Sequence, residues 1–234
     1  MFSMKRNLSL AIIGSCLLIT ASVAQAANAI TNGSFETPTV PVGNFTNFIV
    51  GSNAIPGWTV VGPAGTSVSI VSTTFSQNGV SFPAQDGAQW VDMTGFSINT
   101  TEGLTQSFST IAGDRYQLTY FIGNTTGGGI FGNTSTINVL VNGVQTFSDV
   151  NSTVSPTTQN WQQFSHTFTA TGASTALTFL NGDPASDNDN GLDNIVVTDL
   201  GPAVGAIPEP ETYAMLLAGL GLLGFMGRRR KQQA

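Results

Sequence analysis

The sequence predicts an all-β fold and, within that class, a jelly-roll β-sandwich. About eleven short runs of β-type residues follow one another, separated by clusters of Gly, Asn, Pro and Ser. Between residues 27 and 207 no stretch shows convincing helical periodicity. Charged residues are only 9% of the chain, whereas 69 of its 234 residues are Ser, Thr or Asn. This composition excludes a helix-rich bundle or coiled coil, and short strands at this spacing fit a two-sheet sandwich.

The expected strands are supported by two local patterns. Tyr116, Leu118 and Tyr120 alternate with polar residues, which is the period of a half-buried strand. Asn142-Gly143 lies between two alternating apolar runs and predicts a two-residue hairpin. The full set of expected strands is 47–50, 58–61, 67–71, 89–93, 104–108, 116–122, 137–141, 144–147, 163–169, 176–180 and 192–198.

Residues 1–26 read as a secretory signal peptide. The run from Leu8 to Ile19 is apolar, follows two basic residues, and precedes Ala24-Gln25-Ala26, which has the A-x-A form of a cleavage site. The run is too short for a stable membrane span; a retained anchor and lipidation at Cys16 are the alternatives. Since Cys16 is the only cysteine, the mature chain has no disulfide bond and no thiolate metal ligand.

Residues 203–234 read as a sorting tail. Pro208-Glu209-Pro210 precedes an apolar segment, for which one short transmembrane helix is expected over residues 212–227, and a basic cluster ends the chain. The segment is shorter than the roughly 20 residues that span a bilayer, and the basic end would stay in the cytoplasm. This order predicts transient membrane insertion of a processed signal, with a permanent tail anchor as the alternative.

The tail resembles a PEP-CTERM sorting domain. The resemblance implies an exosortase-type sorting peptidase as a partner, which recognises the tail and cuts near the Pro-Glu-Pro tripeptide. It also implies export to the cell surface or biofilm matrix of a Gram-negative-type bacterium. The residues that carry the resemblance are Pro208, Glu209, Pro210, Arg228, Arg229 and Arg230.

Charge is partitioned between the two ends and the middle of the chain. From Ala27 to Ile207 there is one basic residue, Arg115, against eleven acidic residues, so this part has a formal charge of −10. Such a surface cannot neutralise a phosphate backbone, which excludes nucleic acid as a partner, and it disfavours adhesion to anionic lipid. Neutral sugars and calcium are the ligands that suit an acidic domain rich in hydroxyl groups.

Residues 27–202, the expected sandwich domain, resemble the family called domain of unknown function 642, a galactose-binding-like jelly roll. The resemblance implies this fold and an association with carbohydrate or cell wall, without an established reaction. The matching stretches include 32–36, 55–58, 86–92, 104–108 and 191–195.

Acidic residues are densest near the end of this domain, at Asp183, Asp187, Asp189 and Asp193. Hard oxygen ligands at this density suit calcium, although the pattern is not that of an EF-hand. Resemblance to jelly-roll carbohydrate modules implies a structural calcium held by Glu36 and Asp193. The same run also fits a solvated acidic loop whose Asp and Asn residues cap turns.

Trp90 and Asp92 are the predicted ligand-binding residues. An exposed tryptophan face stacks on the C–H surfaces of sugars, and Trp90 alternates with Val91 beside Asp92. Trp58 and Trp161 are expected to be mostly structural, because most tryptophans of a small sandwich belong to its core.

No residue is predicted to be catalytic. In an extended strand, His166 points to the same face as Phe164 and Phe168. This favours a packed or rim histidine over a general base. Asp86 and Asp92 share parity and could pair for glycoside hydrolysis, which is a less favoured alternative.

These observations predict an exported, non-enzymatic surface or matrix protein that binds or organises extracellular polysaccharide. A purely structural matrix protein without a specific ligand is the first alternative. A glycoside hydrolase or esterase on the same fold is the second.

Overall fold

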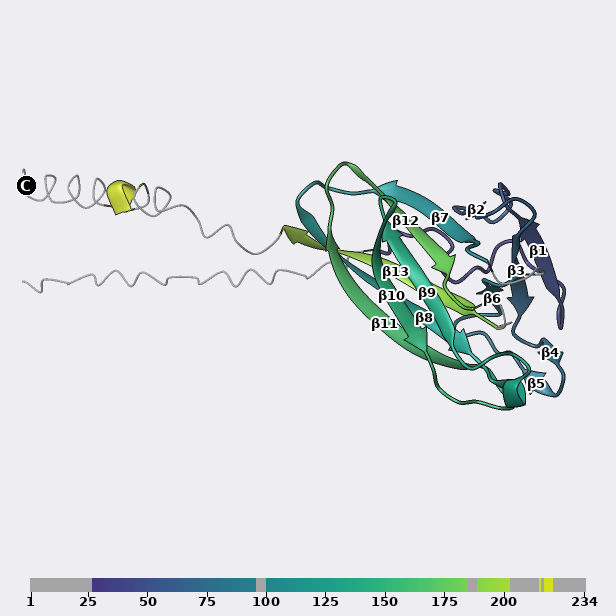
Figure 1. Ribbon diagram of the computed structural model, residues 1–234. Helices are drawn as coiled ribbons and strands as arrows, with labels where there is room; N and C mark the ends of the chain where they lie inside the picture. Colours follow the sequence, from purple (N-terminus) through teal and green to yellow (C-terminus); the bar gives the residue numbers. More distant parts are fainter. Residues whose placement is uncertain (1–26, 96–99, 185–188, 203–214, 216, 221–234) are drawn as a thin grey trace, which may run out of the picture.

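Two antiparallel sheets face each other in a computed structural model that describes residues 27–95, 100–184, 189–202, 215 and 217–220 (Figure 1). The six-stranded sheet has the order β1-β3-β6-β13-β8-β11, and the five-stranded sheet has the order β10-β9-β12-β7-β2. The six-stranded sheet contains β1 (Phe45–Ile49), β3 (Ser67–Ser72), β6 (Gln89–Asp92), β8 (Asp114–Asn124), β11 (Asn160–Thr169) and β13 (Gly191–Pro202). The five-stranded sheet contains β2 (Thr59–Val61), β7 (Gly103–Ser109), β9 (Ser135–Val141), β10 (Val144–Asn151) and β12 (Ser174–Asn181). The predicted all-β sandwich is confirmed.

The main core lies between the two sheets and follows directly from the alternation of side chains along each strand. In β8, Tyr116, Leu118, Tyr120 and Ile122 are buried, whereas Gln117 between them is exposed. Opposite them, the inward residues of β9 and β12 complete the core. Burial of these apolar side chains is the main force that holds the sheets together.

A second apolar cluster lies on the outer face of the six-stranded sheet. Val71 and Trp90 are register partners in β3 and β6, and their neighbours Ile70 and Val91 belong to the core between the sheets. Because successive side chains point to opposite faces, Val71 and Trp90 point outward. A short hairpin, β4 (Ser76–Gln77) and β5 (Val80–Ser81), contributes to the cluster that covers them. We call this the outer cluster, and its buried members are Val71, Val80, Phe82, Trp90 and Phe131.

Two Asn-Gly turns join short hairpins. Asn142 and Gly143 connect β9 to β10 with φ angles of 52° and 81°, which confirms the predicted hairpin. Asn78 and Gly79, which connect β4 to β5, have similar positive φ angles of 52° and 79°. The set of expected strands did not include β4 and β5, because each has only two residues, although the Asn-Gly dipeptide between them is a hairpin signal.

Within the described residues 27–95, 100–184 and 189–202, one short 3-10 turn, Gly127–Gly129, is the only helical element.

Candidate functional site

The outer face of the five-stranded sheet carries only uncharged side chains. Asp149 is the one charged residue in its five strands, and it points inward. The register places outward residues of neighbouring strands side by side, such as Thr105 with Thr178 and Asn138 with Ser148. We call this the neutral face, and its polar members include Thr59, Thr105, Ser107, Asn138, Ser148 and Thr178, all exposed or half-buried.

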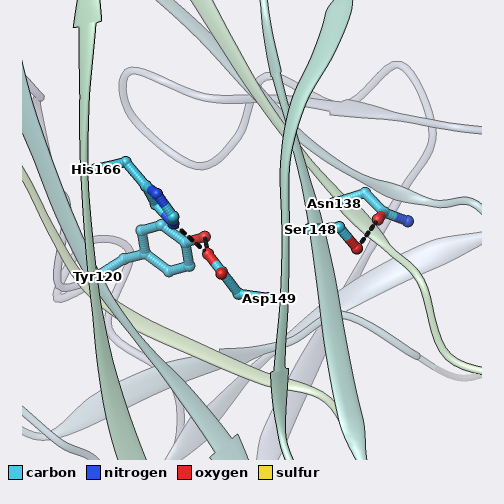
Figure 2. A network of polar contacts seen from close by, with 5 residues as sticks. All are labelled: Tyr120, Asn138, Ser148, Asp149 and His166. Atoms are coloured by element: carbon cyan, nitrogen blue, oxygen red, sulfur yellow. Dashed lines mark hydrogen bonds and ion pairs between the residues drawn. The ribbon is translucent and has the colours of Figure 1, made fainter.

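Cross-strand hydrogen bonds fix the polar groups of the neutral face. The hydroxyls of Thr105 and Thr178 are 2.8 Å apart. Asn138 Oδ1 accepts hydrogen bonds from Ser148 Oγ at 2.8 Å (Figure 2) and from Gln145 Nε2 at 3.3 Å. Hydroxyls and amides held in this way offer donors and acceptors without charge, which suits a hydroxyl-rich, uncharged ligand.

A second polar network lies at the seam between β10 and β11, the edge strands of the two sheets (Figure 2). The hydroxyl of buried Tyr120 donates to Asp149 Oδ2, and His166 Nε2 lies 2.5 Å from the same oxygen. The imidazole of His166 stacks on Phe147 with ring centroids 4.0 Å apart. Burial raises the pKa of Tyr120, and its bond to Asp149 raises that pKa further. His166 is thus a half-buried rim histidine, as expected from its parity.

This seam network links the two sheets and contains no serine or cysteine nucleophile. The sequence reasoning missed Asp149, which has the parity of Phe147 and therefore points into the sandwich. That shared parity with an apolar neighbour is the signal that could have found it.

Asp149→Ala is expected to lower the free energy of unfolding by about 1–3 kcal/mol, because the buried hydroxyl of Tyr120 loses its acceptor. Urea denaturation measures this change. Ser148→Ala is the matched control, since this neighbouring residue faces the opposite way and should change stability by less than about 0.5 kcal/mol. Equal effects of the two substitutions would contradict a structural role for the network.

Trp90 lacks the exposed ring face that its predicted role as a sugar platform requires. Its side chain is only 2% exposed, and its indole Nε1 donates to the carbonyl of Phe82 at 3.1 Å. Its ring stacks on Phe82 and meets the ring of Trp161 edge-on. Trp161 is half-buried and donates to the carbonyl of Pro83, while Trp58 lies buried in the main core. These two tryptophans are structural, as expected.

The carboxylates of Glu36 and Asp193 hold one segment, residues 85–89, against the outer side of the six-stranded sheet. This segment is the loop that leads into β6, together with the first residue of that strand. Asp193 Oδ2 accepts hydrogen bonds from the amides of Gln85 at 2.9 Å and Asp86 at 3.0 Å. Its Oδ1 accepts one from the amide of Asn194 at 2.7 Å. Glu36 Oε1 accepts hydrogen bonds from the amides of residues 88 and 89, at 2.9 and 3.0 Å. We call this arrangement the loop clamp.

A calcium ion at Glu36 and Asp193 would compete with the loop for the oxygens of the two carboxylates. A calcium ion requires six to eight oxygen ligands with free lone pairs, whereas the loop turns N–H donors toward both carboxylates. Burial raises the pKa of Asp193 to about 8, against the lowering effect of the three amides, and the charge of Asp86 adds to the rise. Within the part of the chain that the structure describes, no three carboxyl or imidazole groups come together as metal ligands. Calcium at these two residues stays a prediction.

Asp92 belongs to a group of acidic residues at one end of the sandwich. We call this group, Asp92, Glu102, Asp183 and Asp189, the acidic end. Asp92 Oδ1 accepts hydrogen bonds from the amide and hydroxyl of Thr94 at 2.9 and 2.7 Å. Burial raises the pKa of Asp92 to about 6, and the charge of Glu102 contributes to this rise. Burial also raises the pKa of Asp189 well above its usual value, and the charges of Asp92 and Asp183 add to it.

The predicted pairing of Asp86 with Asp92 does not match this arrangement. The charge of Asp86 acts on Asp193 at the loop clamp, whereas Asp92 interacts with Glu102 and Asp189. Asp92, which is half-buried, therefore belongs to the acidic end and not to an exposed ligand platform beside Trp90. Gln159, whose side chain lies over Gly123 and Gly191, was not found from the sequence because nothing in its local pattern marks it.

Two targeting segments are predicted at the ends of the chain. The predicted signal peptide, residues 1–26, and the sorting residues Pro208, Glu209, Pro210, Arg228, Arg229 and Arg230 lie outside the described residues. None of the residues that the structure describes belongs to a helix long and apolar enough to cross a membrane.

The fold is an all-β sandwich, and the sorting motif that follows it belongs to proteins exported to the cell surface. The chain belongs to the family described as protein of unknown function DUF642, whose model matches residues 28–206. A PEP-CTERM protein-sorting motif matches residues 206–231, which implies export to the cell surface. Both predicted resemblances are confirmed.

Individual proteins give weaker likenesses. Halomucin of Haloquadratum walsbyi is 27% identical over 193 residues, 80% of this chain, but the chain spans only about 2% of that relative's length. The Stig cyclase Fisc of Fischerella sp. TAU, solved with an indole ligand, has a TM-score of 0.55 at 18% identity, covering 77% of this chain and all of that one. An apo cyclase of Fischerella sp. has the same score and identity, covering 78% of this chain and all of that one. At this identity the cyclases are similar to the chain in fold alone.

Proposed function

We propose that this chain is an exported, non-enzymatic surface protein whose sandwich binds or organises an uncharged extracellular polysaccharide. The observation that carries the proposal is the neutral face, where hydroxyl and amide groups are ordered by cross-strand hydrogen bonds and no charged side chain interrupts them. A polysaccharide presents matching hydroxyl groups along its length. The sorting motif supports delivery to the surface where such polymers lie.

The proposal extends to the biofilm matrix and to processing of the tail by an exosortase. Both rest on the sorting motif at residues 206–231. Halomucin, a relative by sequence, is named as a mucin, which agrees with a role among extracellular polymers.

The carboxyl groups of the sandwich favour a binding protein over a glycoside hydrolase. Hydrolysis requires two carboxyl groups on either side of an accessible sugar bond. Asp189 is only 1% exposed, and Asp193 is held by three backbone amides. Neither residue lies on the neutral face.

Binding to uncharged polysaccharides is expected to depend on the neutral face. Full-length chain in mild detergent is titrated against a panel of neutral and acidic polysaccharides, and affinity is measured by calorimetry. Thr178→Lys at the centre of the face and Ser148→Lys at its edge should weaken binding at least tenfold, because each places a long charged side chain among uncharged groups.

Ser165→Lys is the matched control for Ser148→Lys. Both serines are exposed and hydrogen-bonded to one amide side chain, but Ser165 lies on the other sheet, beside Gln117. Ser165→Lys should bind as the wild type does. Equal losses in the two variants would reject the neutral face as the binding surface, and a wild-type protein that binds no member of the panel would favour a purely structural matrix protein.

A further inference from the structure

Two paired glycines create a buried polar site on the outer side of the six-stranded sheet. Gly191 of β13 is the register partner of Gly123 in β8 and of Asp92 in β6. A Cβ atom added to Gly123 would lie 2.9 Å from the side chains of Gln159 and Trp161. A Cβ atom added to Gly191 would lie 3.0 Å from the ring of Trp161 and 3.3 Å from Gln159 Nε2. The absence of side chains at the glycines therefore allows the amide of Gln159 to lie directly over the sheet.

The polar groups beside these glycines are buried and lack hydrogen-bond partners. Gln159 is 3% exposed and Asp189 is 1% exposed. No hydrogen bond of ordinary geometry reaches the amide of Gln159 or the carboxylate of Asp189, although the nearby backbone amide of Thr125 lowers the pKa of Asp189. Asn190 points the other way, toward the five-stranded sheet, where its Nδ2 donates to the carbonyl of Thr136 and to Asn181 Oδ1. Leaving such groups unsatisfied costs free energy, and each one requires an explanation.

No positive side chain compensates the carboxylates at this position. Arg115 is the only Lys or Arg among the described residues, and it lies near the start of β8. Eight residues of strand separate Arg115 from Gly123, which is about 26 Å. At the acidic end the charges of Asp92 and Asp183 both act against ionisation of Asp189. A buried carboxylate is stable only when paired with a cation or hydrogen-bonded.

We propose that Asp92 and Asp189, together with the amide oxygen of Gln159, bind a calcium ion beside the glycine pair. Two carboxylates and an amide carbonyl form an all-oxygen ligand set that suits calcium, which accepts flexible coordination by six to eight oxygens, water included. Zinc is disfavoured because no described cysteine or histidine lies there, since His166 is at the β10–β11 seam. This site is separate from the loop clamp at Glu36 and Asp193.

Calcium titration of the full-length chain tests the site. The protein is first treated with a chelator, and its melting temperature and calorimetric binding are then followed as calcium is added. At a calcium concentration about one hundred times the dissociation constant, the melting temperature should rise by about 5–10 °C. Asp189→Asn and Asp92→Asn should each weaken calcium binding at least tenfold, whereas Glu36→Gln, a carboxylate of the loop clamp, should bind calcium as the wild type does.

The melting temperatures of the chelator-treated proteins provide a second readout. They distinguish a loss of calcium binding from a general loss of stability. Without calcium, Asp189→Asn should melt at a higher temperature than the wild type, because the variant no longer buries a carboxyl group whose ionisation no cation compensates. With calcium, the order should reverse. A calcium response that survives in Asp189→Asn and is lost in Glu36→Gln would overturn the proposal, and so would a wild-type protein with no calcium response.

Discussion

Asp193→Ala is expected to lower the free energy of unfolding by about 3–5 kcal/mol, even when calcium is removed by a chelator. The carboxylate of Asp193 accepts three backbone N–H groups, from Gln85, Asp86 and Asn194, at 2.7–3.0 Å. Alanine would leave these three donors without their acceptor in a partly buried region, and an unsatisfied buried donor costs about 1–3 kcal/mol. Guanidinium denaturation of the full-length chain in chelator measures the change.

Asp86→Ala is the matched control for this prediction, because it removes an exposed carboxylate from the same loop. The backbone amide of Asp86 still donates to Asp193 after the substitution, so stability should change by less than about 0.5 kcal/mol. If Asp193→Ala destabilises the protein only when calcium is present, then its carboxylate acts through an ion. That result would replace the loop clamp by the calcium site that the sequence predicts.

The strands of the sandwich could be predicted because their signals are local. Alternation along β8 and the Asn142-Gly143 turn both depend on neighbouring residues, and both patterns match the structure. The same locality explains why β4 and β5 were missed. Two residues per strand are too few to show a period, and the hairpin forms because it packs into the outer cluster.

The alternation of side chains along a strand tells which face a side chain points to, but not whether other residues cover it there. This is the physical cause of the differences between prediction and structure at the candidate site. Trp90 and Asp92 both point away from the main core, as their positions in β6 predict. Residues distant in sequence, such as Phe131, then bury the indole of Trp90. The site at Gly123 and Gly191 depends likewise on the pairing of β8 with β13, which no local pattern specifies.

Trp90→Ala is expected to destabilise the fold by about 3–5 kcal/mol without removing a sugar contact. The substitution would leave a cavity among Phe82, Trp161 and Val71, and would remove the indole hydrogen bond to the carbonyl of Phe82. Since the outer cluster and the neutral face belong to different sheets, affinity for polysaccharide should be unchanged for the folded fraction. Denaturation and calorimetry on the same preparation measure the two quantities.

Trp90→Phe makes the comparison informative even if the alanine variant does not fold. Phenylalanine retains an aromatic ring in the outer cluster and loses only the indole donor and part of the volume, so the cost should be smaller than for alanine. A sugar platform would give the opposite pattern, because stability would barely change while affinity fell. If Trp90→Phe has normal stability but no longer binds polysaccharide, Trp90 is a ligand-binding residue. If its stability is reduced while binding is intact, the role of Trp90 is to pack β4 and β5 against the six-stranded sheet.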